Sequence, residues 1–149
     1  LLRNILIMLD YLLYIAIVMI SIIIMEVVAI LTHKYIMHGP GWFLHQSHHS
    51  KKRGFFELND FYFIIFSIPS IYCILNGLKY NNNIILSIGI GILSYGLIYI
   101  FLHDIFVHRR FSIVKKVNSS YLKKVRKAHL KHHSVKTKKG CTNFGFITY

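Results

Sequence analysis

The sequence predicts an all-α integral membrane protein, in which three transmembrane helices carry a histidine-rich helical cap on their cytoplasmic side. Two observations lead to this fold class. Hydrophobic residues make up 54% of the 149 residues, with a mean hydropathy of +0.49, and they gather in three long runs. All ten histidines lie outside those runs, in two copies of one spacing pattern. A chain of this length suits a single domain, which we expect to cover residues 1–149.

The three apolar runs have the lengths that membrane-spanning helices need. The first, at residues 5–31, exceeds the roughly 20 residues that cross a bilayer, and we expect its helix to continue until the Gly-Pro-Gly sequence at 39–41. The runs at 61–78 and 84–102 are each close to spanning length. The polar segment 79–83 between them predicts a tight turn, so these two runs form a transmembrane hairpin.

This topology places every histidine on one side of the membrane, and the charges agree with it. Sixteen of the 18 Lys and Arg residues fall on the histidine side, while Arg3 and Lys79 fall on the other. Under the positive-inside rule the histidine side is cytoplasmic. The net charge of +13 either only orients the chain and binds anionic lipid headgroups, or also docks an acidic redox partner. Since the basic residues accompany apolar runs, we expect a lipid bilayer and no nucleic acid as partner.

The histidines form a repeated pattern of H-x4-H followed by H-x2-H-H. Imidazole is the commonest neutral metal ligand near pH 7, so ten imidazoles in a paired arrangement predict a site for more than one metal ion. The candidate metal ligands are His33, His38, His45, His48, His49, His103, His108, His129, His132 and His133.

The local spacing predicts how these side chains point. Residues at i, i+3 and i+4 share a helix face, so each H-x2-H-H predicts three imidazoles aimed at one point. The members of an H-x4-H diverge by about 140° on a straight α-helix. We therefore expect the ring of His38 to turn back where its helix ends, and the helix to loosen after His108. Residues 121–133 predict an amphipathic helix along the membrane interface, with its histidine side inward.

The residue types exclude several kinds of metal site. Five carboxylates cannot supply the Glu-rich di-iron site of a soluble four-helix bundle, and the two distant cysteines, Cys73 and Cys141, do not form the cluster that a zinc finger or an iron–sulfur centre needs. Zinc would support hydrolysis, for which no nucleophile motif is present, whereas iron or copper would activate dioxygen. The residues alone do not choose between iron and copper.

A metal transporter is the rival from another class of protein. Transporters place their ligands inside discontinuous spans near the bilayer midplane. Here no histidine lies within an apolar run. The pattern therefore favours a catalytic centre at the membrane surface.

Two acids are candidate catalytic residues that act behind the metal ligands. Glu26 lies inside the first apolar run, two helical turns before His33, and an ionisable residue there is a functional candidate. Glu26 either supports the metal ligands from outside the metal site or lies on a path for protons, or it is a neutral side chain that only packs. Asp104 either orients the imidazole of His103 or pairs with an arginine that follows. The two acids just before the second run either stand behind the ligands or cap its helix.

Several stretches carry a resemblance to a known family. They are EVVAILTHKYIMHGPGWFLHQSHH, KRGFFELND, YGLIYIFLHDIFVHRRF and YLKKVRKAHLKHH with KKGCTNFGF. Over roughly residues 26–146 the chain resembles the bacterial β-carotene hydroxylases of the membrane fatty acid hydroxylase and sterol desaturase superfamily. The stretches include many residues other than histidine, so the resemblance is more specific than the histidine pattern.

The resemblance implies a non-haem di-iron monooxygenase of a bacterial inner (plasma) membrane. It implies that the histidines bind two iron ions and that O2 is the co-substrate, with electrons from an external donor such as an acidic ferredoxin. The implied reaction is hydroxylation at C3 of the β-ionone rings of carotenoids, from β-carotene to β-cryptoxanthin and then zeaxanthin. The rival on the same fold is a fatty-acyl or sterol hydroxylase or desaturase. Tyr95, Gly96 and Tyr99 either line the path of the ring or are interfacial anchors.

Overall fold

The computed structural model describes residues 1–50, 56–110 and 118–148, and these residues form helices and no strand. Two of the long helices continue into π-helical segments, which are labelled η. The elements are, in chain order, α1 (Leu2–Leu31), η1 (Thr32–Met37), α2 (Trp42–His45), α3 (Asp60–Lys79), α4 (Asn83–Tyr99), η2 (Ile100–Val107) and α5 (Ser120–Ser134).

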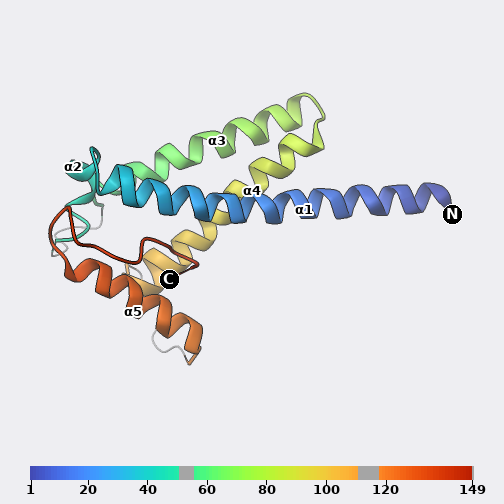
Figure 1. Ribbon diagram of the computed structural model, residues 1–149. Coiled ribbons are helices and arrows are strands. Elements are labelled where there is room, and N and C mark those ends of the chain that lie inside the picture. The colour runs from blue at the N-terminus through green and yellow to red at the C-terminus, as the bar shows by residue number, and fades with distance from the viewer. Residues whose placement is uncertain (51–55, 111–117, 149) are drawn as a thin grey trace.

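Three helices in the described part of the chain are long and apolar enough to cross a membrane. They are α1 with η1, α3, and α4 with η2, and their outer surfaces carry exposed Ile, Leu and Phe side chains. Helix α3 forms a hairpin with α4, and α1 packs along α4 (Figure 1). The amino-terminal part of α1 extends beyond the tip of the hairpin, while α2 and α5 lie at the other end (Figure 1). The predicted architecture of three long apolar helices with a helical cap is therefore confirmed.

The hairpin between α3 and α4 depends on a polar turn and a close helix contact. Asn81 has φ 50°, a left-handed conformation that Asn tolerates, and the side chain of Asn82 accepts a hydrogen bond from the N–H of Ile85 at 3.1 Å. A Cβ atom at Gly77 would lie 2.6 Å from the backbone nitrogen of Leu86. The absence of a side chain at Gly77 lets the two backbones approach, so the sequence of this turn fixes the hairpin.

Each H-x4-H pair begins on a π-helical segment and ends at the residue that follows it, which explains its spacing. In a π-helix the N–H of residue i+5 bonds to the C=O of residue i. The N–H of His38 donates to the C=O of His33 at 3.0 Å, and the N–H of His108 donates to the C=O of His103 at 2.9 Å. The helices end at the second histidine of each pair, as the sequence predicts, since His38 and His108 are the C-caps of η1 and η2; the π-helical form of the turn before them was not predicted. The backbone widens before the second histidine of each pair, which brings both histidines to one side.

The π-helical segments also change where the first histidine of each pair lies. The candidate spans run from Leu2 to Met37 and from Asn83 to Val107, so they include His33 and His103. These helices thus extend past the apolar runs at 5–31 and 84–102, which still contain no histidine. Both histidines lie in the last turns of their spans, at the end that carries the other histidines.

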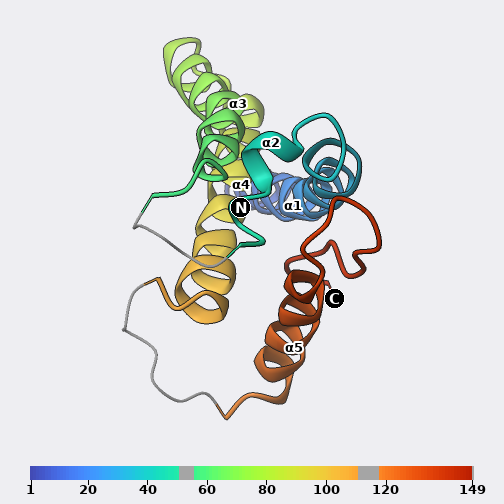
Figure 2. The same cartoon turned by 90° about the vertical axis from the view of Figure 1, so that its left-hand side faces the viewer.

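Helix α5 and the segment after it complete the cap. The Oγ of Ser119 accepts from the N–H of Leu122, which starts the helix at the position that the amphipathic pattern predicts. The buried face of α5 carries three histidines and Val125, which packs against Phe106 and Val107 of η2. Residues 135–148, which we call the C-terminal strap, then run back between α5 and α1 (Figures 1 and 2).

Candidate metal centre

The ten histidines form two sets of five in the cap. In each set, the five ring nitrogen atoms that face one another all lie within 4.8 Å. The sets touch, because the ring of His49 stacks on that of His133 with 4.5 Å between the ring centroids. Site A contains His33, His38, His45, His49 and His132, and site B contains His48, His103, His108, His129 and His133.

Each site takes four histidines from one copy of the sequence pattern and one from the other copy. His132, on α5, completes site A, and His48, in the turn after α2, completes site B. The expectation that an H-x2-H-H aims three imidazoles at one point is wrong, because neighbouring residues point about 100° apart around a helix. The outer pair of histidines, at i and i+4, shares one site, and the middle histidine faces the other site. Neither site is complete without both copies.

The hydrogen bonds of His33 and His45 leave two nitrogen lone pairs facing each other in site A. Nδ1 of His33 donates to the carbonyl oxygen of Phe144 at 3.0 Å, and Nδ1 of His45 donates to Oδ1 of Asn59 at 2.7 Å. Neutral rings with these bonds carry no proton on Nε2. Yet the two Nε2 atoms are 3.1 Å apart. Two imidazole nitrogens bound to one metal at roughly 2.1 Å and at right angles lie about 3 Å apart, so a metal ion fits between them.

The same arrangement recurs within site A between His38 and His132. Their Nε2 atoms are 3.1 Å apart. The Nδ1 atoms of the two rings donate to the carbonyl oxygens of Lys138 and Thr142, at 3.1 and 2.8 Å. Two further lone pairs therefore face the same point, as the ligands of one cation would.

Site B repeats the arrangement with carboxylates behind the rings. The Nε2 atoms of His48 and His103 are 2.9 Å apart. Nδ1 of His48 donates to Glu57 at 2.7 Å, and Nδ1 of His103 donates to Asp104 at 3.0 Å. Nε2 of His133 is buried with no hydrogen-bond partner in the described part of the chain. A buried polar atom without a partner is costly, and a metal ion in site B removes that cost.

Burial keeps the imidazoles of the cap in the neutral form that binds metal. Removal from water lowers the pKa of His45 to about 3 and the pKa values of His49 and His132 to about 4. Burial, followed by repulsion from neighbouring histidines, also lowers the pKa values of His48 and His129 well below the usual range. These imidazoles are therefore ready to bind metal at neutral pH without losing a proton.

An arginine links the acids behind site B. Arg110 Nη2 lies 2.7 Å from Asp60 Oδ1 and 3.8 Å from Glu57 Oε2, and Arg110 Nε lies 3.9 Å from Asp104 Oδ1. The sequence left open whether Asp104 orients the imidazole of His103 or pairs with an arginine. In the structure it does both, since its Oδ1 accepts from Nδ1 of His103 and lies beside the guanidinium of Arg110. Glu57 accepts a hydrogen bond from Nδ1 of His48, whereas Asp60 accepts from the backbone N–H of Glu57 at 3.0 Å.

Glu26 holds the C-terminal strap against α1. Its Oε1 accepts from the N–H groups of Phe146, Ile147 and Thr148 at 3.0, 2.9 and 2.8 Å, and from Oγ1 of Thr148 at 2.9 Å. Its Oε2 accepts from the hydroxyl of Tyr95 at 2.8 Å. Five donors converge on the two oxygen atoms of this side chain, which offer about four lone-pair sites, so the geometry favours a role in positioning the strap.

The C-terminal strap supplies the groups that orient most ligands of site A. Four histidines of this site donate their Nδ1 protons to its backbone, which fixes the rings and directs their Nε2 atoms inward. The acceptors are the carbonyl oxygens of Val135, Lys138, Thr142 and Phe144. The ring of Phe146 stacks on His33, with 5.3 Å between centroids and 11° between planes.

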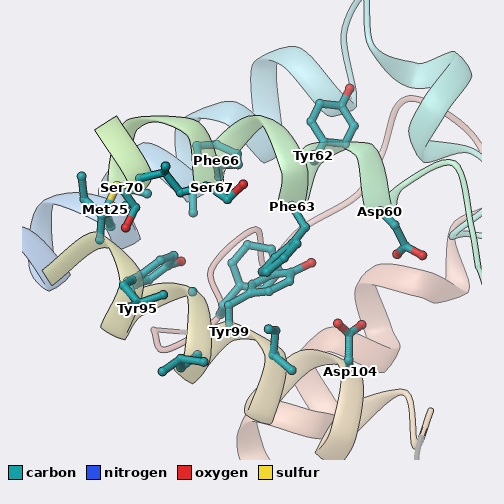
Figure 3. Close-up of a pocket in the computed structure, with 18 of the residues that line it drawn as sticks. Met25, Asp60, Tyr62, Phe63, Phe66, Ser67, Ser70, Tyr95, Tyr99 and Asp104 are labelled. Carbon is teal, nitrogen blue, oxygen red and sulfur yellow. The ribbon is translucent and has the colours of Figure 1, made fainter. Parts of the chain in front are cut away.

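A mostly apolar pocket of 310 Å³ lies between α1, α3 and α4 (Figure 3), and two of its lining residues, Tyr99 and Phe146, contact histidines of the sites. Tyr99, in its wall, stacks on His103 with 4.6 Å between the ring centroids, and Phe146 packs edge-on against Tyr99 at the same distance. Tyr95 and Gly96 also line this pocket, and whether the three α4 residues form the path of a substrate ring stays a prediction. The volume is at the lower end of ordinary ligand pockets.

Comparison with known proteins identifies the family of this chain. Residues 18–149 match the family model described as Fatty acid hydroxylase. The chain belongs to the fatty acid hydroxylase family.

Three relatives illustrate how similar this fatty acid hydroxylase is to proteins of named activity. A β-carotene hydroxylase of Pantoea ananas is 44% identical over 137 residues, which cover 88% of this chain and 74% of the relative. A β-carotene hydroxylase of Paracoccus sp. (strain PC1) is 36% identical over 132 residues, or 88% of this chain and 81% of the relative. The chloroplastic β-carotene 3-hydroxylase 2 of Arabidopsis thaliana is 37% identical over 118 residues, or 76% of this chain and 39% of the relative. No solved structure matches the chain.

The sequence pattern named all ten histidines that this fatty acid hydroxylase brings together, but it missed groups behind them. Asn59, which accepts from His45, lies in the stretch KRGFFELND that carried part of the resemblance, and this was its one signal. The carbonyl groups of the strap have no signal in the sequence, because every residue has a carbonyl. Phe146 lies in the FGF stretch but gave no sign that it would contact His33.

Proposed function

We propose that this chain is a β-carotene 3-hydroxylase. It inserts one oxygen atom of O2 at C3 of the β-ionone rings of carotenoids, which converts β-carotene to β-cryptoxanthin and then to zeaxanthin. Each hydroxylation consumes one O2, two electrons and two protons, and it releases one water. The names and the degree of identity of the bacterial relatives support this substrate, and the family supports the reaction.

The observation that carries the proposal is an all-histidine pair of metal sites beside an apolar pocket. Two iron ions held by the ten histidines would supply the chemistry that activates O2 towards an unreactive C–H bond. The lone pairs that face one another in each site, and the orienting bonds behind them, are the features that such ions need.

The pocket fits the end of a carotenoid. Its walls are mostly apolar and aromatic, with Asp60 and Asp104 among the few polar lining residues, and its 310 Å³ has room for one cyclic end group while the rest of the molecule stays in lipid. Tyr99 and Phe146 touch both the pocket and the histidines, so they would hold the ring beside the metal centre. The exposed Leu93 and Leu97 also line the pocket, which gives it a route to the outer surface of the helices.

The distribution of charge supports a cytoplasmic metal centre in a bacterial inner membrane. The positive-inside rule assigns the side with most Lys and Arg to the cytoplasm. The basic cap would also dock an acidic electron donor such as a ferredoxin. A membrane site of this kind lets the substrate arrive through lipid while electrons and protons arrive from water.

The experiment is chromatography of pigments from β-carotene-accumulating bacteria that express the intact chain or its His48→Ala variant. We expect β-cryptoxanthin and zeaxanthin with the intact chain only. Unchanged β-carotene, from membrane-inserted and iron-loaded protein with a ferredoxin present, would contradict the proposal.

A lipid substrate is the second candidate, because the family model is described as a fatty acid hydroxylase. Fatty-acyl and sterol analysis of the same cells separates the two, since new hydroxylated or unsaturated lipid without new pigment supports a lipid hydroxylase or desaturase. A metal transporter would instead move metal ions across vesicles and consume no O2.

A further inference from the structure

The groups behind the two metal sites differ in charge. In site A, four ligands donate their Nδ1 protons to neutral backbone carbonyls of the strap, and His45 donates to the neutral amide of Asn59. In site B, His48 donates to the carboxylate of Glu57. The two sites thus have the same type of ligand, but the groups that accept the Nδ1 protons of the ligands differ in charge.

The carboxylates behind site B form a partly buried cluster with Arg110. Glu57 and Asp104 each accept from a histidine of this site, and Asp60 lies 2.7 Å from Arg110. The side chains of Glu57 and Asp104 are 12% and 16% exposed, and that of Arg110 is 10% exposed. Water therefore screens these charges little. Among the residues that the structure describes, the carboxylates of Glu57, Asp60 and Asp104 lie within 4 Å of the guanidinium of Arg110.

This difference acts on the metal ions through the imidazole rings. A carboxylate that accepts the Nδ1 proton makes the imidazole more basic and a stronger electron donor to its metal. Negative charge nearby also favours the more highly charged state of a metal ion, by Coulomb attraction in a medium of low dielectric constant. A backbone carbonyl or an amide fixes the ring in the same way but brings no net charge.

We propose that the two sites are electronically unequal and that the ion in site B is oxidised more easily than the ion in site A. Glu57 and Asp104 are the positioning residues that lower the potential of the ion in site B. The positive charge of Arg110 makes this lowering smaller. This inference rests on the proposed function as a two-iron oxygenase. It gives Glu57 and Asp104 the role of making two all-histidine sites differ in redox potential.

The test is a redox titration of the full chain in lipid nanodiscs, loaded with ⁵⁷Fe²⁺ and followed by Mössbauer spectroscopy. We expect the two ferrous ions of the unaltered chain to be oxidised in two steps at different potentials. Glu57→Gln keeps the hydrogen-bonding shape and removes the charge, so it should move only the lower-potential step, and move it upwards. It should also weaken the binding of one ion, about 10–100-fold in a chelator competition.

The matched variant is Asn59→Asp, which gives site A the carboxylate that it lacks. It should move only the higher-potential step, downwards, and so narrow the gap between the steps. Loss of one ion in Glu57→Gln, with the higher-potential ion retained, also supports the inference.

The inference is overturned if both ions of the unaltered chain are oxidised in one step, or if Glu57→Gln moves the higher-potential ion. A chain that takes up no iron contradicts the proposed function as well. A chain that binds two irons and hydroxylates carotenoid, yet oxidises both ions together, contradicts this inference alone.

Discussion

The middle histidine of each H-x2-H-H shows most clearly how single residues build the centre. His48→Ala removes a ligand from site B and His132→Ala removes one from site A, although each lies in the sequence copy that supplies the other site. We expect each variant to bind one metal ion instead of two and to lose turnover, because neither site keeps its five ligands. Metal analysis of the purified protein measures the first effect and pigment analysis the second.

Lys131→Ala is the control for these variants, since Lys131 is exposed and adjoins His132 in sequence. It should keep both ions. Two ions per chain and normal turnover in His48→Ala or His132→Ala would show that the altered residue is not a required ligand.

Glu26 is the second residue whose removal gives a specific prediction. Glu26→Ala leaves three backbone N–H groups and two hydroxyls without their acceptor, and a buried donor without a partner costs about 1–3 kcal/mol. We expect the strap to come away from α1, so that the chain is cut by protease near its carboxyl end and site A binds metal more weakly.

Glu26→Gln keeps one carbonyl oxygen for the strap, so its effect should be smaller. Limited proteolysis with mass spectrometry measures both variants. A strap as resistant in Glu26→Ala as in the unaltered chain would show that this carboxylate does not anchor it.

At the scale of elements, the sequence predicted the three long apolar helices and α5, but not the short α2 or the form of the helix ends. Runs of apolar residues predict α1, α3 and α4 because helix formation in a membrane depends on length and hydropathy. The π-helical segments were missed because an H-x4-H can be read on an α-helix with a bent end as easily as on a π-helix. The i+5 hydrogen bonds of His38 and His108 are the feature that distinguishes the two, and they exist only in three dimensions.

The contact between α3 and α4 gives a prediction for an element. Gly77→Ala places a Cβ against the backbone of Leu86, which cannot move as a flexible side chain can. We expect the hairpin to lose about 1–3 kcal/mol of stability and to separate at this point. Gly96→Ala is the matched control on α4, because a Cβ there meets nothing within 4 Å. Thermal unfolding in detergent compares them, and equal melting temperatures would contradict the close contact.

At the scale of the whole molecule, the sequence predicted that the ten histidines lie close together, but not which five of them form each metal site. Three spans bring all the histidine clusters to one end, and this follows from topology alone. The exchange of His48 and His132 between the sites does not follow from it, because it depends on how α2 and α5 face each other. The role of the strap was also not predicted. Its carbonyl groups orient the ligands of site A and Glu26 anchors it, and neither backbone carbonyls nor one acidic residue makes a recognisable pattern in a sequence.

The orientation in the membrane gives a prediction for the molecule as a whole. In a background without the native cysteines, Lys139→Cys lies in the cap and Tyr80→Cys lies at the tip of the hairpin, and both positions are exposed. We expect an impermeant thiol reagent outside intact cells to label Tyr80→Cys only, and Lys139→Cys to be labelled only in opened cells. The reverse pattern would place the metal centre on the outer face.

Isotope labelling of the product tests the central claim, an O2-dependent hydroxylation of carotenoid at this two-metal centre, most directly. The purified, iron-loaded chain would receive β-carotene, a ferredoxin reducing system and ¹⁸O2, and the pigments would be analysed by mass spectrometry. The account predicts one ¹⁸O atom in each new hydroxyl group, and no labelled product from His48→Ala. Hydroxyl oxygen that comes from water, or no hydroxylated carotenoid from protein that holds two irons, would contradict it.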